Sequence, residues 1–103
     1  MNASVTLAQL TIFCSRDLED RVVTELDRAA VEGFFRLPGG TGNKFREHGG
    51  VPRTITWEAT MFVVPAAPAE RIEAIVRALQ SHAGACEIRP CLRMTVAPLD
   101  LAL

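Results

Sequence analysis

The sequence predicts a single α+β domain in which a four-stranded antiparallel sheet carries two helices on one face. Four segments show the alternating or short continuous apolar pattern of strands. Two segments repeat apolar residues at the 3.6-residue spacing of amphipathic helices. Their order along the 103 residues is strand, helix, strand, strand, helix, strand. Two right-handed βαβ connections then place both helices on the same face of the sheet.

The composition is that of one globular domain, residues 1–103. Hydrophobic residues make up 49% of the chain, and the formal net charge of −1 excludes a basic nucleic-acid footprint. No apolar run approaches the roughly 20 residues of a membrane helix. The first positive charge, Arg16, follows the N-terminal apolar stretch, whereas a secretory signal has the reverse order. We therefore expect a cytoplasmic protein that is not inserted in a membrane, with its three cysteines reduced.

The first βαβ unit begins with a strand over residues 5–14, whose apolar side chains alternate. Apolar residues then recur at helical spacing and charged residues fill the other side, which predicts a helix over about 16–31. Gly33 follows where a left-handed residue would end the helix. Residues 34–37 form a short apolar second strand.

No periodicity is present in residues 38–53, which hold five of the seven glycines and two of the six prolines. A loop of this length inside a compact domain is usually functional or disordered. Glycine has the most backbone freedom to lose on ordering. The composition therefore predicts a long flexible loop between the second and third strands.

The second unit repeats the pattern of the first. Residues 54–64 alternate cleanly and place Trp57 and Phe62 on opposite faces, and a helical stripe follows over about 68–82. Pro90 lacks a backbone donor, so the last strand should lie at a sheet edge or carry a bulge. The resulting fold is ferredoxin-like. Its uncovered face carries either Trp57 or Phe62, and a half-apolar face favours oligomerisation.

Two groups of residues suit an anion, although neither the P-loop nor the dinucleotide fingerprint is present. Residues 40–44, Gly-Thr-Gly-Asn-Lys, follow a strand and could present successive backbone N–H groups, with Lys44 supplying charge. The alternative is an ordinary surface hairpin loop. Arg89 and Arg93 share one strand face and suit a phosphate or carboxylate. The alternative there is an exposed polar face with Glu87 as the ion-pair partner.

The cysteines and histidines do not have the spacing of a metal site. Cys86 and Cys91, interpreted as members of one strand, point to opposite faces and cannot bind one ion together. Cys14 and Cys86 fall on the apolar stripe, where a free cysteine normally packs as an inert side chain. No nucleophile, base and orienting group stand together either. We predict no tightly bound metal and no enzymatic activity.

The motifs and their order resemble the nitrogen-regulatory PII signalling superfamily. Residues 10–13 and the helix end at 30–34 are similar to the family's first strand and helix. The Gly-Thr-Gly-Asn-Lys segment at 40–44 resembles the Gly-x-Gly-Arg-Gln motif at the base of the family's long T-loop. Residues 56–64 and 69–76 are similar to the third strand and second helix.

This resemblance implies a homotrimer that binds an adenine nucleotide (ATP, ADP or AMP) in clefts between subunits, with bicarbonate as a further candidate effector. The implied nucleotide contacts are Gly40, Gly42, Asn43, Lys44, Gly84, Arg89 and Arg93. The flexible loop would regulate a protein partner such as a membrane transporter or an enzyme. The implied partner contacts are Phe45, Arg46, Glu47, His48 and Arg53.

The chain departs from the family pattern at three points. The B-loop motif Thr-Gly-x-x-Gly-Asp-Gly-Lys is missing, the chain has no tyrosine to be uridylylated, and Asn43 replaces the phosphate-binding arginine. The chain is therefore more similar to the divergent PII-like branch associated with bicarbonate transport, carboxysomes or heavy-metal efflux. Two alternatives share the fold: a CutA-like or heavy-metal-efflux-associated trimer that responds to metals, and a structural interaction module without a ligand.

Overall fold

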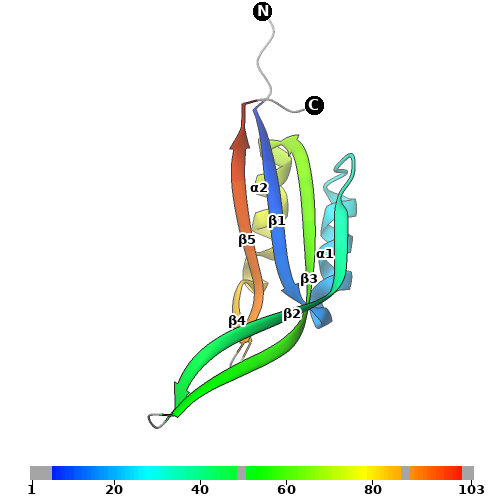
Figure 1. Cartoon of the computed structure of the whole chain (residues 1–103). Helices are drawn as coiled ribbons and strands as arrows, with labels where there is room; N and C mark the ends of the chain where they lie inside the picture. The colour runs from blue at the N-terminus through cyan, green and yellow to red at the C-terminus, as the bar shows by residue number, and fades with distance from the viewer. Residues whose placement is uncertain (1–5, 49–50, 87–88, 101–103) are drawn as a thin grey trace, which may run out of the picture.

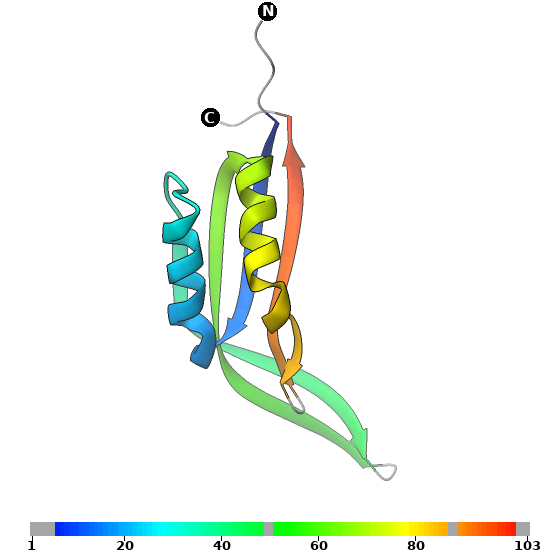
Figure 2. The same ribbon diagram turned by 180° about the vertical axis from the view of Figure 1, so that it is seen from behind.

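Two helices lie on one face of an antiparallel sheet in the computed structural model of the chain, as Figure 2 shows from the helix side. The structure describes the backbone of residues 6–48, 51–86 and 89–100. It also describes their side chains, except those of residues 44–48, 51–53, 84–86 and 89–90.

The observed elements confirm the predicted ferredoxin-like order. The strands are β1 (Leu7–Ser15), β2 (Phe35–His48), β3 (Val51–Pro68), β4 (Gly84–Cys86) and β5 (Arg89–Leu99). The helices are α1 (Glu19–Arg28) and α2 (Ala69–Leu79), with 3-10 turns at Arg16–Leu18 and Gln80–His82. The sheet order is β2-β3-β1-β5-β4, so the short β4 is an addition to the predicted four strands. Within the described residues, no helix is long and apolar enough to cross a membrane.

The end of α1 differs from the prediction. The left-handed residue is Ala30, with a φ of 53°, and Gly33 does not adopt this conformation. A residue with a Cβ pays about 1–2 kcal/mol for this backbone geometry. Arg71 of α2 donates a hydrogen bond of 2.9 Å to the Ala30 carbonyl, which ties the turn to the second helix.

The core fills the space between the helices and the sheet. Among the largest fully buried side chains are Phe62, Leu10, Ile12, Leu26, Ile72, Ile75, Leu79 and Leu92. Full burial of one such side chain contributes about 1.5–3 kcal/mol. Phe62 therefore belongs to the covered face, and Trp57, an odd number of residues away, belongs to the open face. The structure thus decides which of the two residues lies on the open face, a choice that alternation alone leaves open.

A bulge in β2 separates the sheet from a long two-stranded arm. Leu37 pairs with Met61 and Gly40 pairs with Ala59, so β2 carries one extra residue between these two pairs. Gly39, in this interval, has a φ of 75°. Bulges with a left-handed glycine bend the strand and increase its twist. Beyond the bulge, residues 40–48 and 51–59 form the arm, which leaves the sheet at an angle (Figure 1).

The predicted absence of regular structure in 38–53 is therefore corrected. The backbone is paired from Gly40 with Ala59 to His48 with Val51, and the connection lies between strands two and three as expected. A Gly-Gly pair flanked by two strands is a hairpin signal, and pairing along the arm satisfies backbone groups that a loop would leave to water. The molecule is elongated as a result, with extents of 63 × 25 × 24 Å. The flexibility of this segment stays a prediction.

The first residues of β5 pair with β4. Pro90 lies opposite Ala85, beside a register shift between Gly84 and Ala85. The proline thus occupies the irregular, edge-proximal position expected of a residue without a backbone donor. Beyond Leu92, where the pairing with β4 ends, β5 forms the edge of the sheet (Figure 1).

The placement of the cysteines also needs correction. Cys86 and Cys91 do not share one strand, because the chain reverses between β4 and β5. Cys91 is disulfide-bonded, which contradicts the expectation that all cysteines are reduced. Cys14 is a free and buried cysteine, as its position on the apolar stripe predicts.

Candidate functional site

A hollow of about 380 Å³ opens on the uncovered face of the sheet, where the arm begins. This volume lies within the range of about 300–1,000 Å³ typical of small-molecule sites. Four strands contribute the lining residues of this open-face hollow: Phe13, Cys14, Thr41, Gly42, Asn43, Trp57, Ala59 and Arg93. Three of the predicted nucleotide contacts, Gly42, Asn43 and Arg93, are thus brought together.

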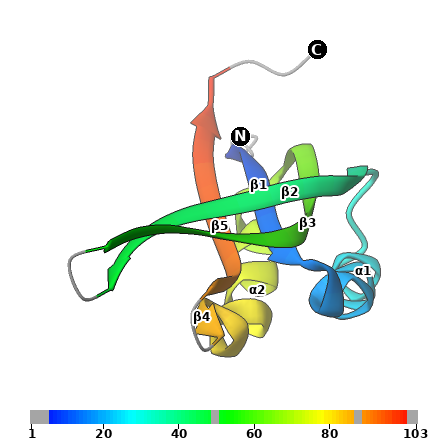
Figure 3. The ribbon, with the colours of Figure 1, turned by 60° about the horizontal axis from the view of Figure 1, so that its bottom comes forward.

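Small residues between large ones create the hollow. Ala59 lies opposite Ser15 of β1 and Gly40 of β2, so this row of the sheet has little side-chain volume. Phe13 and Trp57 stand on either side of it. The bend of the arm carries the strands across the ends of β1 and β5, as Figure 3 shows, so that residues of β2 approach Arg93.

The indole of Trp57 lies flat against the backbone of Gly42. A Cβ added to Gly42 would be 2.2 Å from Cε2 of the indole and 2.5 Å from both Cζ2 and Nε1. Cζ2 and Nε1 are the two atoms bonded to Cε2 on the outer edge of the indole. A Cβ lying in the ring plane beyond this edge would be nearer to Cζ2 and Nε1 than to Cε2, which is the reverse of what is found. The Cβ position is therefore above the ring. Only glycine fits beneath the indole in this position.

Asn43 is oriented by a neighbour on the paired strand. Thr56 Oγ1 donates a hydrogen bond of 2.9 Å to Asn43 Oδ1. In this orientation the Nδ2 group has two donors and no hydrogen-bond acceptor among the described residues. Asn43 and Thr56 pair next to Gly42 and Trp57, so their side chains lie on the other face of the hairpin from the indole.

Arg93 supplies the positive charge of the hollow. It lies opposite Phe13 in the register of β1 with β5, and its side chain is exposed. In the described part of the chain, no acidic side chain lies within ion-pairing distance of it. Glu87, the alternative partner, lies outside the described residues. An unpaired guanidinium beside an apolar hollow suits a bidentate phosphate or carboxylate.

The other predicted nucleotide contacts are placed by their backbone. Gly40 pairs with Ala59, and a Cβ on it would lie 3.1 Å from the Ala59 carbonyl oxygen. Gly84 pairs with Leu92, next to Arg93. Lys44 pairs with Ile55 in the arm, and Arg89 pairs with Cys86. The side chains of Lys44 and Arg89 lie outside the described part of the structure.

The predicted partner contacts all lie in the outer half of the arm. Their backbone pairs are Phe45 with Thr54, Arg46 with Arg53, Glu47 with Pro52 and His48 with Val51. The side chains of this region are outside those that the structure describes. The register nevertheless places all five residues beyond the hollow, on the part of the arm farthest from the sheet (Figure 1).

A second hollow, of about 400 Å³, contains charged residues that already have partners. Arg16 pairs with Glu58 at 2.8 Å, and Arg36 pairs with Glu19 at 2.5 Å. Thr60 donates a further hydrogen bond to Glu19. Because each arginine faces a carboxylate, this cluster joins α1 to β2 and β3 rather than offering free charge to a ligand.

The thiol of Cys14 is suited to packing and not to chemistry. Burial raises its pKa to about 11, the charge of Glu19 adds to the increase, and Arg36 opposes it. The thiol is therefore protonated at neutral pH and is a poor nucleophile and metal ligand. Within the described ranges, no group of three His, Cys, Asp or Glu side chains could share a metal ion.

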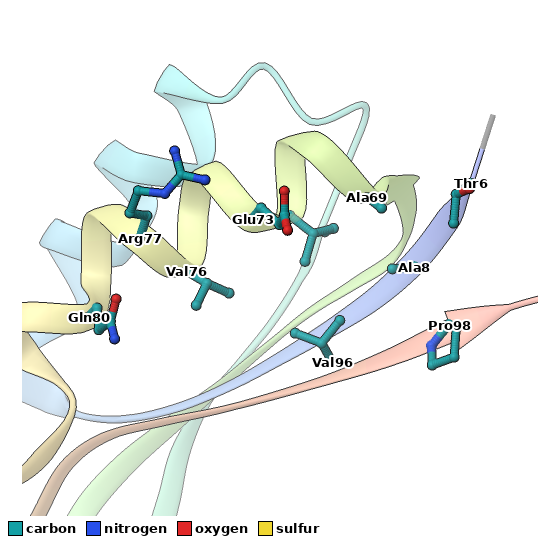
Figure 4. Close-up of a pocket in the computed structure, with 10 residues that line it drawn as sticks. Thr6, Ala8, Ala69, Glu73, Val76, Arg77, Gln80, Val96 and Pro98 are labelled. Carbon is teal, nitrogen blue, oxygen red and sulfur yellow. The ribbon is translucent and has the colours of Figure 1, made fainter.

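An apolar groove of about 440 Å³ lies on the opposite face, between α2 and the edge of the sheet. Figure 4 shows Val76 of α2 and Val96 of β5 pointing toward one another across it. Val96 is 50% exposed. Arg77 is the positive charge on this groove's margin, where it lies with Glu73. The groove suits an apolar group better than an anion, so we place the candidate anion site in the open-face hollow.

Solved structures share this fold. The chain is similar to Bacillus subtilis GlnK in its complex with ATP, with a TM-score of 0.71 and 8% identity, over 95% of this chain and 85% of GlnK. It is similar to CPII, a nitrogen regulatory PII-like protein from Thiomonas intermedia K12 bound to ADP, AMP and bicarbonate. There the TM-score is 0.61 and the identity 17%, over 95% and 97% of the two chains.

The same fold also occurs within a larger protein. A Bacillus cereus protein related to NIF3 matches with a TM-score of 0.65 and 18% identity, over 97% of this chain but 27% of that one. No protein family and no curated protein sequence matches this chain. The chain therefore has the fold of PII-like proteins, and at these identities the likeness concerns the fold alone.

Proposed function

We propose that the chain is a PII-like regulatory protein that binds an adenine nucleotide in the open-face hollow. The observation that carries the proposal is the convergence of Gly42, Asn43 and Arg93 around this hollow, where Arg93 has no ion-pair partner among the described residues. A similar fold is found with ATP in GlnK and with ADP, AMP and bicarbonate in CPII. Bicarbonate is a further candidate effector, because a small anion also suits Arg93.

Homotrimer formation on the open face is part of this proposal. Phe13, Phe35 and Leu37 are 45%, 64% and 47% exposed. Register places Met61 between Phe13 and Leu37, and Val63 beside Phe35. A contiguous apolar surface of this kind favours burial against other copies of the chain. A neighbouring subunit would then close the hollow and form the proposed inter-subunit cleft.

The arm is the proposed regulatory element. Its base lines the hollow through Thr41, Gly42 and Asn43, while its outer half lies beyond the sheet. A ligand held at the base therefore contacts the same two strands that present the predicted partner residues. We propose that occupancy changes the arm and thereby its binding to a transporter or enzyme, without chemical change of the nucleotide.

Calorimetric titration of the full chain with AMP, ADP and ATP, with and without bicarbonate, tests the proposal. Arg93→Ala removes one charge-assisted contact of about 1.5–3 kcal/mol, so affinity should fall roughly ten- to a hundredfold. Arg77→Ala is the matched control, because it removes an exposed arginine from the apolar groove on the other face. Equal affinity of Arg93→Ala and wild type would contradict the proposed site. A response to divalent metals alone would favour the metal-responsive alternative.

A further inference from the structure

We infer that Trp57 is the surface on which the base of the ligand stacks, so that the hollow selects nucleotides by their aromatic ring. The inference rests on the proposed function and deepens it. Within the described residues, Trp57 combines an aromatic side chain with direct contact to the base of the arm. It is also the one tryptophan in the chain.

The position of the indole is set by the strand pairing. Trp57 lies opposite Gly42, and one face of its ring rests on that glycine. Because glycine has no side chain, the indole lies close to the sheet surface instead of standing away from it. The side chain is half-buried and lines the hollow together with Ala59, whose side chain is only a methyl group.

The hollow combines two kinds of lining residue that a nucleotide can use. Trp57 and Phe13 supply aromatic surface, and the Arg93 guanidinium supplies hydrogen-bond donors and a positive charge. A ligand that uses both kinds has a flat apolar ring and an anionic group. A simple anion such as ribose 5-phosphate or bicarbonate would use Arg93 and leave the aromatic surface unused.

This arrangement predicts an order of affinity. Stacking strength grows with ring area, so purine nucleotides should bind more tightly than pyrimidine nucleotides, and both more tightly than ribose 5-phosphate. Base stacking on an aromatic side chain corresponds to about a five- to hundredfold change in affinity upon alanine substitution. Trp57→Ala should therefore weaken AMP binding by this factor. Trp57→Phe retains a ring and should lose much less.

The experiment is a titration of the full chain with AMP, CMP and ribose 5-phosphate, followed by calorimetry and by tryptophan fluorescence. With one tryptophan and no tyrosine, the emission reports on Trp57 alone. We expect saturable quenching by AMP at the calorimetric dissociation constant, weaker binding of CMP, and a much weaker response to ribose 5-phosphate. Val96→Ala, in the apolar groove, is the control variant and should match wild type.

The outcomes separate the inference from the proposed function. If AMP binds by calorimetry but leaves the Trp57 emission unchanged, the stacking inference is overturned and nucleotide binding stands. Equal affinities for AMP and ribose 5-phosphate would overturn it in the same way. If AMP, CMP and ribose 5-phosphate all fail to bind, both statements are refuted. Because the fluorescence titration uses wild-type protein, it does not depend on the folding of any variant.

Discussion

Gly42→Ala is the substitution whose effect follows most directly from the structure. The added Cβ would lie 2.2 Å from Cε2 of Trp57, where an ordinary carbon contact is about 3.5–4.0 Å. The indole must therefore move by more than 1 Å. Gly42 has no positive φ, so the backbone accepts alanine and the whole effect comes from this contact.

The expected cost is that of overpacking, about 1–3 kcal/mol. Part of the cost is avoided if the indole swings away from the arm, because the side chain is only half-buried. In either case Trp57 leaves its position over Gly42. The fluorescence emission should then shift to longer wavelength, and AMP affinity should decrease together with it.

Two other glycines serve as matched controls in chemical denaturation and fluorescence measurements. Gly33→Ala meets no atom within 4 Å and has no positive φ, so the variant should be neutral or more stable by about 0.4–1 kcal/mol. Gly39→Ala meets no atom either, but its φ of 75° should cost about 1–2 kcal/mol. Neither should change the Trp57 emission as Gly42→Ala does. An unchanged emission spectrum in Gly42→Ala would refute the placement of the indole.

Three further results are expected. The pKa of the Cys14 thiol is raised from 9.0 to about 11, so the folded state holds its proton to higher pH than the unfolded state. The stabilisation is complete below pH 9 and is lost as the pH rises through 11, by about 3 kcal/mol in total. Cys14→Ala should remove this part of the pH dependence in denaturation curves. Cys91→Ser should lower the free energy of unfolding by about 2 kcal/mol, and a dithiol reductant should abolish the difference between variant and wild type. Hydrogen exchange should be faster in arm residues 43–48 than in β1, and AMP should slow it; strong protection of the free arm would contradict the regulatory switch.

The helices and the core could be predicted from the sequence, because a helix that buries one face repeats its apolar residues with a period of 3.6. Leu26 and Ile72 lie on stripes of 3.6 spacing, and both are fully buried. Alternation could not decide which face of β3 is covered, because Trp57 and Phe62 are both large and apolar. The packing of Phe62 under the helices, with Phe34 and Arg36 against its ring, decides this.

The arm could not be predicted from composition, because glycines in a segment without periodicity indicate backbone flexibility rather than strand pairing. Gly39 provides a left-handed residue in a bulge, and Gly42 provides contact with a ring. Each glycine thus serves a paired structure rather than a loose one. Local composition cannot distinguish these uses, since both depend on the strand on the other side of the hairpin.

Three of the eight residues that line the candidate site were accessible to sequence reasoning. Gly42, Asn43 and Arg93 were predicted, because glycines and basic residues are recognisable wherever they occur. Phe13 and Trp57 were not, since alternation shows only that they share the open face with many others. Their proximity depends on the bend of the arm over β1 and β5, which no local pattern records. The isolated tryptophan opposite a glycine was the signal that could have found this part.

The central claim is that the open-face hollow binds an adenine nucleotide, and amide chemical-shift mapping with AMP tests it most directly. A chain of 103 residues is small enough for such mapping. We predict that the largest shifts occur at Gly42, Asn43 and Arg93, with small changes at Val76 and Arg77 in the opposite groove. Shifts centred on the groove between α2 and β5, or no shifts at saturating AMP, would contradict the claim.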